Sequence, residues 1–259
     1  MSVQCVILAG GRGTRISEES HLRPKPMIEI GGHPILWHIM KRYGAFGVTD
    51  FVICLGYRGY MIKEYFFNYF LHGSDVTIDI ATNTPTYHNS RSEPWKVTLV
   101  DTGDATQTGG RVLRVRPYLD PDQPFFLTYG DGLSNVDIDA QLQFHRRHGR
   151  LATMTVVRPP ARFGRTRLED DRIVAFEEKP QATSGMINGG FFVLSPPVLD
   201  LIEGDDTLWE TAPIQQLVAM DQLRAWRHDG FWQAMDTMRE KELLEGMWDA
   251  GDPPWKAWE

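Results

Sequence analysis

The residues best suited to chemistry lie near the N-terminus, in a glycine-rich segment with basic neighbours. Three glycines follow an apolar run within Leu8–Arg15, and Lys25 comes soon after inside the motif R-P-K-P. Glycines after a buried strand let backbone N–H groups approach a phosphate closely, and Arg and Lys side chains add positive charge. The segment therefore predicts a phosphate-binding loop. A tight turn between a strand and a helix would explain the glycines, but not the basic side chains.

Two familiar nucleotide-binding motifs do not fit this loop. The dinucleotide fingerprint G-x-G-x-x-G would need a glycine at position 16, where the sequence has Ile16. The P-loop needs a Gly-Lys pair, and the sequence contains none. Hydride transfer with a dinucleotide and P-loop hydrolysis are therefore disfavoured.

Two aspartates could hold a metal ion for phosphoryl-group transfer. Asp131 lies between two glycines directly after an apolar run, and Asp236 precedes a predicted helix. Transfer from a nucleoside triphosphate ordinarily needs Mg²⁺, which carboxylates and substrate phosphates hold. Each aspartate also has an ordinary interpretation, since Gly-Asp-Gly suits a tight turn and an aspartate before a helix can cap it. Their spacing alone identifies no metal site.

The histidines predict no zinc site, because the sequence has no His-x-x-x-His pair and no cysteine cluster. His145 and His148 lie close together in a basic stretch, which predicts a solvated helix face. Cys5 and Cys54 both lie in apolar runs, so we expect them to be buried, free thiols.

Composition and charge restrict the partners of the chain. It has 259 residues, of which 42% are hydrophobic, and a formal net charge of −7. Such a charge disfavours nucleic acid or an anionic membrane as a partner. No window approaches 18 uninterrupted apolar residues, so no membrane-spanning segment is expected. The absence of a leader pattern and the buried thiols predict a soluble, cytoplasmic protein.

Short β-rich runs alternate with helical patterns, which predicts βαβ units and an α/β fold. The expected architecture is a Rossmann-like, mostly parallel mixed sheet flanked by helices, with small antiparallel additions. Strands are expected over Cys5–Ala9, Phe51–Leu55, Val76–Ala81, Val97–Val100, Phe125–Thr128, Ala152–Val157, Arg172–Glu177 and Gly190–Leu194. Helices are expected over Pro34–Phe46, Tyr60–Leu71, Val112–Tyr118, Ile138–Arg147, Leu208–Met220 and Thr237–Trp248.

Several motifs together resemble the sugar-1-phosphate nucleotidyltransferase family. L-A-G-G-x-G-T-R with x-P-K-P resembles its signature, and Tyr129–Gly132 resembles its metal-binding aspartate after a strand. Phe176–Pro180 resembles its sugar-phosphate motif, and Asn188–Gly190 resembles its sugar-contacting strand. The resemblance covers essentially the whole chain and implies the GT-A-like nucleotidyltransferase fold as a single domain, 1–259. It implies a nucleotide-binding lobe over 1–135 and a sugar-binding and oligomerisation lobe over 136–259.

The resemblance also implies a reaction. The phosphate oxygen of a sugar 1-phosphate attacks the α-phosphorus of a nucleoside triphosphate, and pyrophosphate leaves in line. The resemblance pairs Asp131 with Asp236 as ligands of Mg²⁺. It implies that Arg15 binds the leaving pyrophosphate and that Lys25 binds the transferring α-phosphate together with Mg²⁺. The expected catalytic residues are therefore Arg15, Lys25 and Asp131.

Binding residues follow from the same resemblance. The expected nucleotide-binding residues are Leu8, Ala9, Gly10, Gly11, Arg12, Gly13, Thr14, Thr108, Gly109, Arg111 and Gly130. The expected sugar-phosphate-binding residues are Glu178, Lys179, Asn188 and Gly189. Considered without the resemblance, Glu178 and Lys179 would suit a solvated hairpin edge, and Asn188–Gly190 is an ordinary turn signal.

Within the family, the chain is most similar to members that transfer a cytidylyl group to glucose 1-phosphate. The similarity rests on Glu93–Gly103, Thr108–Arg111 and the ending P-P-W-K-A-W-E. A cytosine pocket needs an acceptor for the N4 amino group and donors for O2 and N3, which Thr108–Arg111 could supply. The implied reaction converts CTP and α-D-glucose 1-phosphate into CDP-glucose and pyrophosphate. It would be the first step toward dideoxy sugars of surface polysaccharides such as O-antigen.

Two alternatives stay open. The enzyme could use another nucleoside triphosphate or another sugar 1-phosphate, since Arg162 and Arg165 add charge near the sugar side. The chain could instead be a non-catalytic regulatory subunit that binds a nucleotide sugar. A binding module would not need Lys25, Asp131 and Asp236 together, which weighs against that interpretation.

Aromatic residues predict self-association. They crowd the helical segment Tyr65–Phe70, and tryptophans are frequent in the C-terminal tail. Aromatic side chains are common both in cores and in subunit interfaces. We therefore expect a homo-oligomer, and the resembling enzymes imply a trimer or a hexamer.

Overall fold

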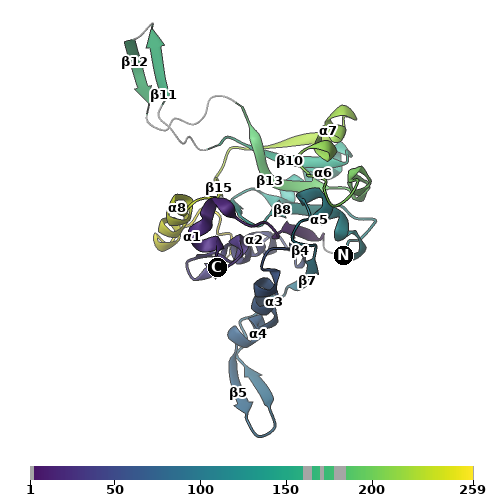
Figure 1. Ribbon diagram of the computed structural model, residues 1–259, viewed down its shortest axis with the longest axis vertical. Coiled ribbons are helices and arrows are strands. Elements are labelled where there is room, and N and C mark those ends of the chain that lie inside the picture. The colour runs from purple at the N-terminus through teal and green to yellow at the C-terminus, as the bar shows by residue number, and fades with distance from the viewer. Residues whose placement is uncertain (1–2, 160–164, 170–171, 178–184, 259) are drawn as a thin grey trace.

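A seven-stranded sheet forms the centre of the molecule (Figure 1). The computed structural model describes residues 3–159, 165–169, 172–177 and 185–258. The strand order is β14-β10-β13-β8-β1-β4-β7, and only β13 runs antiparallel to its neighbours. The strands are β1 (Cys5–Leu8), β4 (Asp50–Leu55), β7 (Lys96–Asp101), β8 (Phe125–Tyr129), β10 (Ala152–Val157), β13 (Ile187–Leu194) and β14 (Leu223–His228). The predicted mostly parallel mixed sheet is confirmed.

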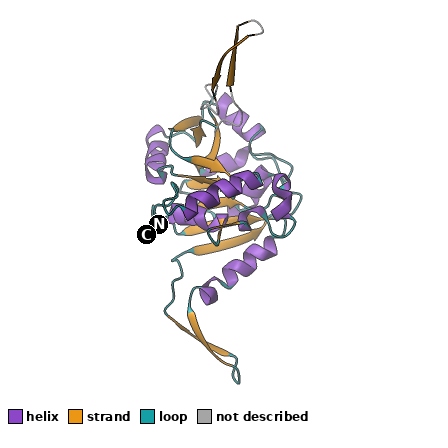
Figure 2. Ribbon diagram, turned by 90° about the vertical axis from the view of Figure 1, so that its left-hand side faces the viewer, coloured by secondary structure: helices purple, strands orange, loops and turns teal. Residues whose placement is uncertain are grey.

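Helices cover both faces of this sheet (Figure 2). Alternate residues of β1 face opposite layers, since Cys5 and Ile7 join one hydrophobic cluster and Val6 and Leu8 join the other. Burial on both faces explains why this apolar run does not alternate with polar residues. The first cluster includes side chains of α2 (Ile35–Gly44), α6 (Ile138–His148) and α8 (Met238–Asp249), and the second includes side chains of α5 (Thr108–Arg114) and α7 (Ala212–Ala219). Among the described residues, no helix is both long and apolar enough to cross a membrane.

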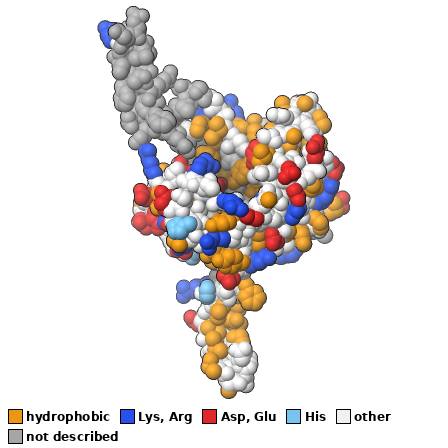
Figure 3. Space-filling model, in the orientation of Figure 1, with side chains coloured by type: hydrophobic (Ala, Val, Ile, Leu, Met, Phe, Trp, Pro, Cys, Tyr) orange, Lys and Arg blue, Asp and Glu red, His pale blue; other side chains and the backbone are white. Residues whose placement is uncertain are grey.

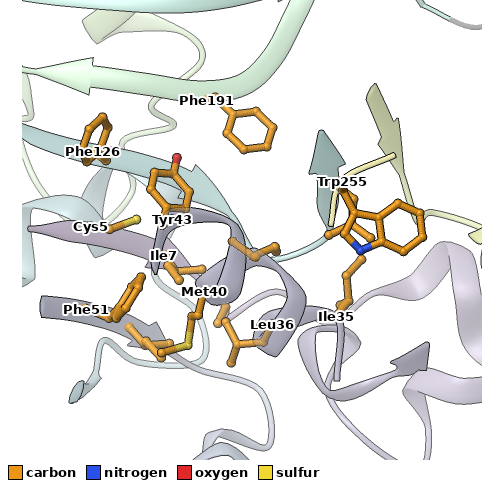
Figure 4. Packing of buried hydrophobic residues seen from close by; sticks show 14 of the residues in the cluster. Cys5, Ile7, Ile35, Leu36, Met40, Tyr43, Phe51, Phe126, Phe191 and Trp255 are labelled. Atoms are coloured by element: carbon orange, nitrogen blue, oxygen red, sulfur yellow. The ribbon is translucent and has the colours of Figure 1, made fainter. Parts of the chain in front are cut away.

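Helix α2 shows how the sequence builds the first layer. Pro34 precedes it with the fixed φ that proline favours at a helix start, and apolar residues then recur on one face. Tyr43 of this helix packs edge-on against Phe126 of β8, with ring centroids 5.4 Å apart. Figure 4 shows α2 side chains pointing into the cluster, together with residues of β1, β4 and the C-terminal tail. The labelled residues are Cys5, Ile7, Ile35, Leu36, Met40, Tyr43, Phe51, Phe126, Phe191 and Trp255.

The predicted small antiparallel additions are present as two-stranded pairs. They are β2 (Glu29–Ile30) with β3 (His33–Pro34), β5 (Asp75–Asp79) with β6 (Thr84–His88), β9 (Gly132–Ser134) with β15 (Trp232–Ala234), and β11 (Arg165–Glu169) with β12 (Arg172–Glu177). The β5–β6 pair projects from the body beyond α3 (Gly59–Phe67) and α4 (Tyr69–His72) (Figure 1). We call this projection, residues 59–88, the arm.

Some predicted element boundaries were wrong. The helix expected over Tyr60–Leu71 is interrupted at Asn68, which separates α3 from α4. The helix expected over Val112–Tyr118 begins earlier, as α5, and only a 3₁₀ turn, Arg116–Tyr118, follows it. The helix expected from Leu208 begins at Ala212, next to a proline that suits a helix start. Strands β2, β3, β6, β9, β11, β14 and β15 were not predicted, because they are short, polar or at an edge.

The prediction of a solvated face at His145 was wrong. This side chain is 4% exposed, and its ring nitrogens lie 2.9 Å from the Thr153 hydroxyl and 3.0 Å from the Ser195 hydroxyl. His38 is also buried, with Nε2 2.8 Å from the Ile30 carbonyl oxygen. Burial lowers the pKa of both histidines to about 4. Both rings are therefore neutral in the folded protein at neutral pH.

These histidines predict a loss of stability in mild acid. The unfolded chain binds a proton on each histidine near pH 6.5, whereas the folded chain does so only near pH 4. The stability they contribute is therefore complete above pH 6.5 and is lost as the pH falls toward 4, by up to about 1.4 kcal/mol per pH unit for each histidine. Urea unfolding between pH 7 and pH 4 measures this slope. His145→Gln is expected to make the unfolding free energy depend less steeply on pH. His72 is exposed on α4, so His72→Gln is the control and is expected to keep the wild-type slope. Equal slopes in both variants would contradict the role of His145.

Candidate active site

The glycine-rich loop lines a cavity of about 550 Å³ at the carboxyl edge of the sheet. β1 and β8 are parallel and in register at Leu8 and Tyr129, so the loops that follow them emerge side by side. Ligands bind at such edges in open α/β sheets, outside the carboxyl ends of the strands. The cavity collects every predicted nucleotide-binding residue except Gly109, and it also includes the catalytic candidates Arg15, Lys25 and Asp131.

Four of the predicted charged residues converge on one point. The Lys25 Nζ lies 2.6 Å from Asp131 Oδ2 and 2.6 Å from Asp236 Oδ1. Arg15 Nη1 donates a hydrogen bond of 2.8 Å to the other oxygen of Asp236. Lys25 is only 7% exposed, so burial acts to lower its pKa, but the attraction and hydrogen bonds of the two carboxylates outweigh burial and raise it. The ammonium group therefore stays charged and holds the two aspartates together.

The chain brings Asp236 to this point through a short strand and a cap. β15 pairs with β9, which follows Asp131, and the Met235 N–H donates to the Asp131 carbonyl oxygen at 2.9 Å. The helix-cap interpretation of Asp236 was wrong, because Thr237 caps α8 and forms a capping box with Glu240. The Asp236 N–H donates to the Glu240 carboxylate at 2.7 Å. The Asp236 carboxylate is thus free of the helix and points to Lys25.

Asp131 lies in a tight turn and also contributes its carboxylate to the site, so both interpretations of Gly-Asp-Gly apply. Gly130 and Asp131 form the turn between β8 and β9. The Gly130 N–H donates to the Leu8 carbonyl oxygen at 2.9 Å, and a Cβ on Gly130 would meet that same oxygen at 2.9 Å. Glycine is needed here because the two parallel chains approach too closely for a side chain. The turn therefore serves to hold the Asp131 carboxylate against Lys25.

The two carboxylates fit a magnesium ion. Both lie against the same ammonium nitrogen, so they already share one cationic partner. Carboxylate oxygens are the hard ligands that Mg²⁺ prefers, and the ion commonly uses one or two of them with substrate phosphates and water. The described residues contain no cluster of three or more His, Cys, Asp or Glu side chains suited to a metal. Any metal ion here would therefore depend on Asp131, Asp236 and the substrate.

Arg111 lies beneath the glycine-rich loop, with much of its guanidinium already bonded to protein. Its Nη1 donates to the Leu55 carbonyl oxygen and to the Thr102 hydroxyl, both at 2.9 Å. Its side chain is buried, and burial lowers its pKa. The guanidinium connects the end of β4 to the segment that follows β7, and it lies against Gly10. The sequence predicts Arg111 as a nucleotide-binding residue, but it does not predict this support of the cavity floor.

Gly10→Ala is expected to destabilise the protein. A Cβ at Gly10 would lie 2.0 Å from Arg111 Nη1, and the hydrogen bonds of that nitrogen oppose its displacement. Overpacking of this kind costs about 1–3 kcal/mol. The measurement is chemical unfolding without ligand, and the matched control is Gly11→Ala, because a Cβ at Gly11 would have no neighbour within 4 Å. An equal loss in both variants would show that backbone freedom, and not Arg111, is responsible.

A second pocket, of about 360 Å³, adjoins the aspartates. It contains Asn188 and Gly189 together with Arg15, Asp131 and Asp236. Asn188 and Gly189 belong to β13, so the interpretation of Asn188–Gly190 as a turn was wrong. The strand pairing is irregular here, and Gly190 adopts a positive φ of 78° that favours glycine. Two of the predicted sugar-phosphate-binding residues are thus placed beside the predicted metal ligands.

The other two predicted sugar-phosphate-binding residues, Glu178 and Lys179, lie outside the described residues. A further acidic residue, Glu210, also borders the second pocket and was not predicted from the sequence. Glu210 lies in the acidic segment before α7, which carries no recognisable motif. Its carboxylate accepts a hydrogen bond of 2.6 Å from the Thr108 hydroxyl, so Thr108 connects the two cavities.

This chain is similar to several known proteins. The family model described as nucleotidyl transferase matches residues 4–237. The glucose-1-phosphate cytidylyltransferase of Salmonella typhi is 55% identical over 257 residues, which cover 99% of this chain and 100% of that protein. The mannose-1-phosphate guanyltransferase of Hypocrea jecorina is 30% identical over 247 residues, covering 93% of this chain and 62% of that protein.

Solved structures match the fold over nearly the whole chain. A crystal structure of UDP-glucose pyrophosphorylase complexed with UDP-glucose superposes with a TM-score of 0.69. The match covers 96% of this chain and 99% of that one. The sequence identity is 15%, so this likeness supports the fold alone.

Proposed function

The chain belongs to the nucleotidyl transferase family, and from that premise we propose that it transfers the cytidylyl group of CTP to α-D-glucose 1-phosphate. The products are CDP-glucose and pyrophosphate. The relative at 55% identity over the full chain supports these substrates, because it is a glucose-1-phosphate cytidylyltransferase. The guanyltransferase at 30% identity is a more distant relative, which favours CTP over other nucleotides.

One structural observation carries the proposal. Asp131 borders both cavities, the one with the glycine-rich loop and the one with Asn188. Lys25 contacts both Asp131 and Asp236 there. A triphosphate in the first cavity and a sugar phosphate in the second would thus react beside these residues. The two carboxylates, with a Lys25 ammonium between them, suit the transfer of a phosphoryl group.

The residues would act mainly by position and charge. The phosphate of glucose 1-phosphate is already an anionic nucleophile, so no general base is required. Lys25 and Arg15 offset the repulsion between two polyanions and stabilise the charge that develops on the leaving pyrophosphate. The backbone N–H groups of the glycine-rich loop would hold the triphosphate. The Arg111 guanidinium, bonded to the Leu55 carbonyl oxygen, lies against Gly10 of that loop.

We propose that the enzyme uses Mg²⁺, held by Asp131 and Asp236 with the substrate phosphates. When bound, this ion would neutralise phosphate charge and polarise the phosphoryl oxygens. Before substrate binding, Lys25 keeps the two carboxylates together and so preserves the ligand pair.

An assay of pyrophosphate release tests the proposed reaction. The purified protein is incubated with Mg²⁺, glucose 1-phosphate and each of CTP, UTP, dTTP, ATP and GTP. We expect rapid release with CTP and formation of CDP-glucose. Activity with UTP or dTTP and none with CTP would contradict the choice of nucleotide. No activity with any pair of substrates would instead favour the regulatory subunit.

We also propose that the protein is a homo-oligomer, a trimer or a hexamer. The support is the arm, whose exposed aromatic and aliphatic side chains include Phe67 and Ile80, 88% and 84% exposed. Figure 3 shows hydrophobic side chains along the projecting arm. At its base, an apolar groove of about 680 Å³ includes Phe66, Phe70 and Trp95. In contrast, Trp255 of the C-terminal tail is fully buried within the subunit.

The oligomeric state can be measured by light scattering. We expect a molar mass of three or six times the 29.6 kDa of one chain, and the mass of a monomer would contradict the proposal.

The proposed compartment is the cytoplasm. The described thiols Cys5 and Cys54 are both free and buried, as a reducing compartment allows. CDP-glucose made there would be a precursor of surface polysaccharide. Fractionation of the source cells tests the location.

A further inference from the structure

One carboxylate of the second pocket, that of Glu210, has no role in the reaction proposed above. Glu210 borders this pocket together with Asn188, Gly189 and Tyr129, but it does not border the cavity of the glycine-rich loop. The carboxylate is solvent-exposed, although its two oxygens have protein partners. Its position suits a contact with whatever occupies the second pocket.

The protein holds this carboxylate in one orientation. Glu210 Oε1 accepts a hydrogen bond of 2.5 Å from the Tyr129 hydroxyl, and Oε2 accepts one of 2.6 Å from the Thr108 hydroxyl. Thr108 in turn accepts a hydrogen bond of 3.0 Å from the N–H of Trp209, which is fully buried. Burial, with the nearby Glu210 charge, raises the pKa of Tyr129, so its hydroxyl remains a donor. A carboxylate has about four lone-pair sites, so about two remain for a ligand.

The glycines of Thr108–Arg111 allow the segment that carries Glu210 to pack closely against this motif. The Gly110 N–H donates to the Thr207 carbonyl oxygen at 3.2 Å. A Cβ on Gly109 would lie 2.7 Å from that oxygen, and a Cβ on Gly110 would lie 2.6 Å from the Asp205 backbone. These glycines therefore permit a close approach of backbones, and Glu210 is placed relative to the nucleotide cavity through this contact.

The negative charge of Glu210 determines which part of a substrate it can contact. Both proposed substrates carry negative charge on phosphate groups, which a carboxylate repels. The basic residues Arg15 and Lys25 lie at the phosphate side, where the two cavities join. A fixed carboxylate with free lone pairs is instead an acceptor for neutral hydroxyl groups. In the second pocket, those hydroxyls belong to the sugar.

We propose that Glu210 is a specificity-determining residue that accepts a hydrogen bond from a hydroxyl group of the glucose ring. This inference rests on the proposed function, because it assumes that a sugar 1-phosphate occupies the second pocket. Tyr129 and Thr108 act as positioning residues for the carboxylate. Asn188 Nδ2 lies 3.5 Å from the Tyr129 hydroxyl, so the same group of side chains connects Glu210 to β13.

The test is Glu210→Gln, assayed with glucose 1-phosphate and with its 2-, 3-, 4- and 6-deoxy analogues. Loss of a hydrogen bond to a charged acceptor is expected to raise the KM for glucose 1-phosphate about tenfold or more. The KM for CTP and kcat are expected to change less than about threefold, because Glu210 contacts the nucleotide cavity only through the hydroxyls of Thr108 and Tyr129, and a glutamine oxygen can still accept from one of them. For one deoxy analogue, wild type and variant are expected to have the same KM, since the hydroxyl that Glu210 would bind is missing.

Asp205→Asn is the matched control. Asp205 lies in the same segment, and its carboxylate pairs with Arg114 at the surface and does not border the second pocket. This variant is expected to keep the wild-type KM for every analogue. A uniform rise in KM for CTP and all sugars in Glu210→Gln, or an unchanged KM for glucose 1-phosphate, would overturn the inference. If the wild type itself does not convert glucose 1-phosphate with CTP, the proposed function fails first, and the two failures are thus distinguishable.

Discussion

Lys25→Ala is expected to lower kcat by about 10²- to 10³-fold, as the loss of one preorganised charge at a reacting phosphate commonly does. Lys25 Nζ lies 2.6 Å from both Asp131 and Asp236, so its charge lies beside the proposed metal ligands. The alanine variant removes the ammonium group and leaves two carboxylates facing one another. Both effects oppose the approach of a second polyanion. Pyrophosphate release at saturating CTP and glucose 1-phosphate measures the loss.

The same variant has a second readout that does not depend on turnover. Without Lys25, the two carboxylates repel each other, and a divalent cation would relieve that repulsion. Mg²⁺ should therefore raise the unfolding temperature of Lys25→Ala more than that of the wild type. Lys96→Ala is the control, because Lys96 pairs with Asp50 at 3.1 Å and lies exposed in the edge strand β7. An active Lys25→Ala variant with no response to Mg²⁺ would contradict the role of Lys25.

The glycine-rich loop could be predicted from the sequence because its signal is local. An apolar strand, three glycines and the following Arg15 and Lys25 lie within one short stretch. The strand is buried on both faces, so its composition alone identifies a central strand of a parallel sheet. The edge strand β14 behaves differently, since charged and apolar residues mix along Leu223–His228 and periodicity does not distinguish it from a loop.

The partners of this loop could not be found from spacing. Lys25 and Asp236 are 211 positions apart. The pairing of β9 with β15 places Asp236 near Asp131, the other carboxylate that contacts Lys25. Only a resemblance to a known family could pair the two aspartates in advance. Glu210 lies 102 positions from Thr108 and belongs to no recognised motif, so even the resemblance did not reveal it.

Arg111 and His145 show why residue type is an incomplete guide to burial. Arginine is rarely buried, yet Arg111 is 5% exposed because carbonyl and hydroxyl oxygens accept its hydrogen bonds. His145 is 4% exposed because Thr153 and Ser195 meet both ring nitrogens. In each case the partners come from other elements, and their arrival at the site is a property of the fold.

Asp236→Asn is expected to lower kcat by about 10²-fold, because it removes one of two carboxylates at the reacting centre while preserving the size of the side chain. Asp236 is 13% exposed and accepts hydrogen bonds from both Lys25 and Arg15. An amide provides one oxygen and no charge, so both basic residues lose part of their partner. The Mg²⁺ concentration for half-maximal activity is expected to rise about tenfold. Titration of pyrophosphate release with Mg²⁺ measures both changes.

Binding of Mn²⁺, followed by electron paramagnetic resonance in the presence of CTP alone, separates metal binding from turnover. Asp236→Asn should bind Mn²⁺ more weakly than the wild type, because only Asp131 would remain as a charged ligand. Asp200→Asn is the matched control, since Asp200 pairs with Arg116 at the exposed surface and borders neither cavity. An Asp236→Asn variant with undiminished kcat and an unchanged dependence on Mg²⁺ would refute the paired-aspartate site. A fall in kcat with unchanged Mn²⁺ binding would instead assign Asp236 to positioning Lys25 and Arg15, and would leave Asp131 as the single metal-binding carboxylate of the pair.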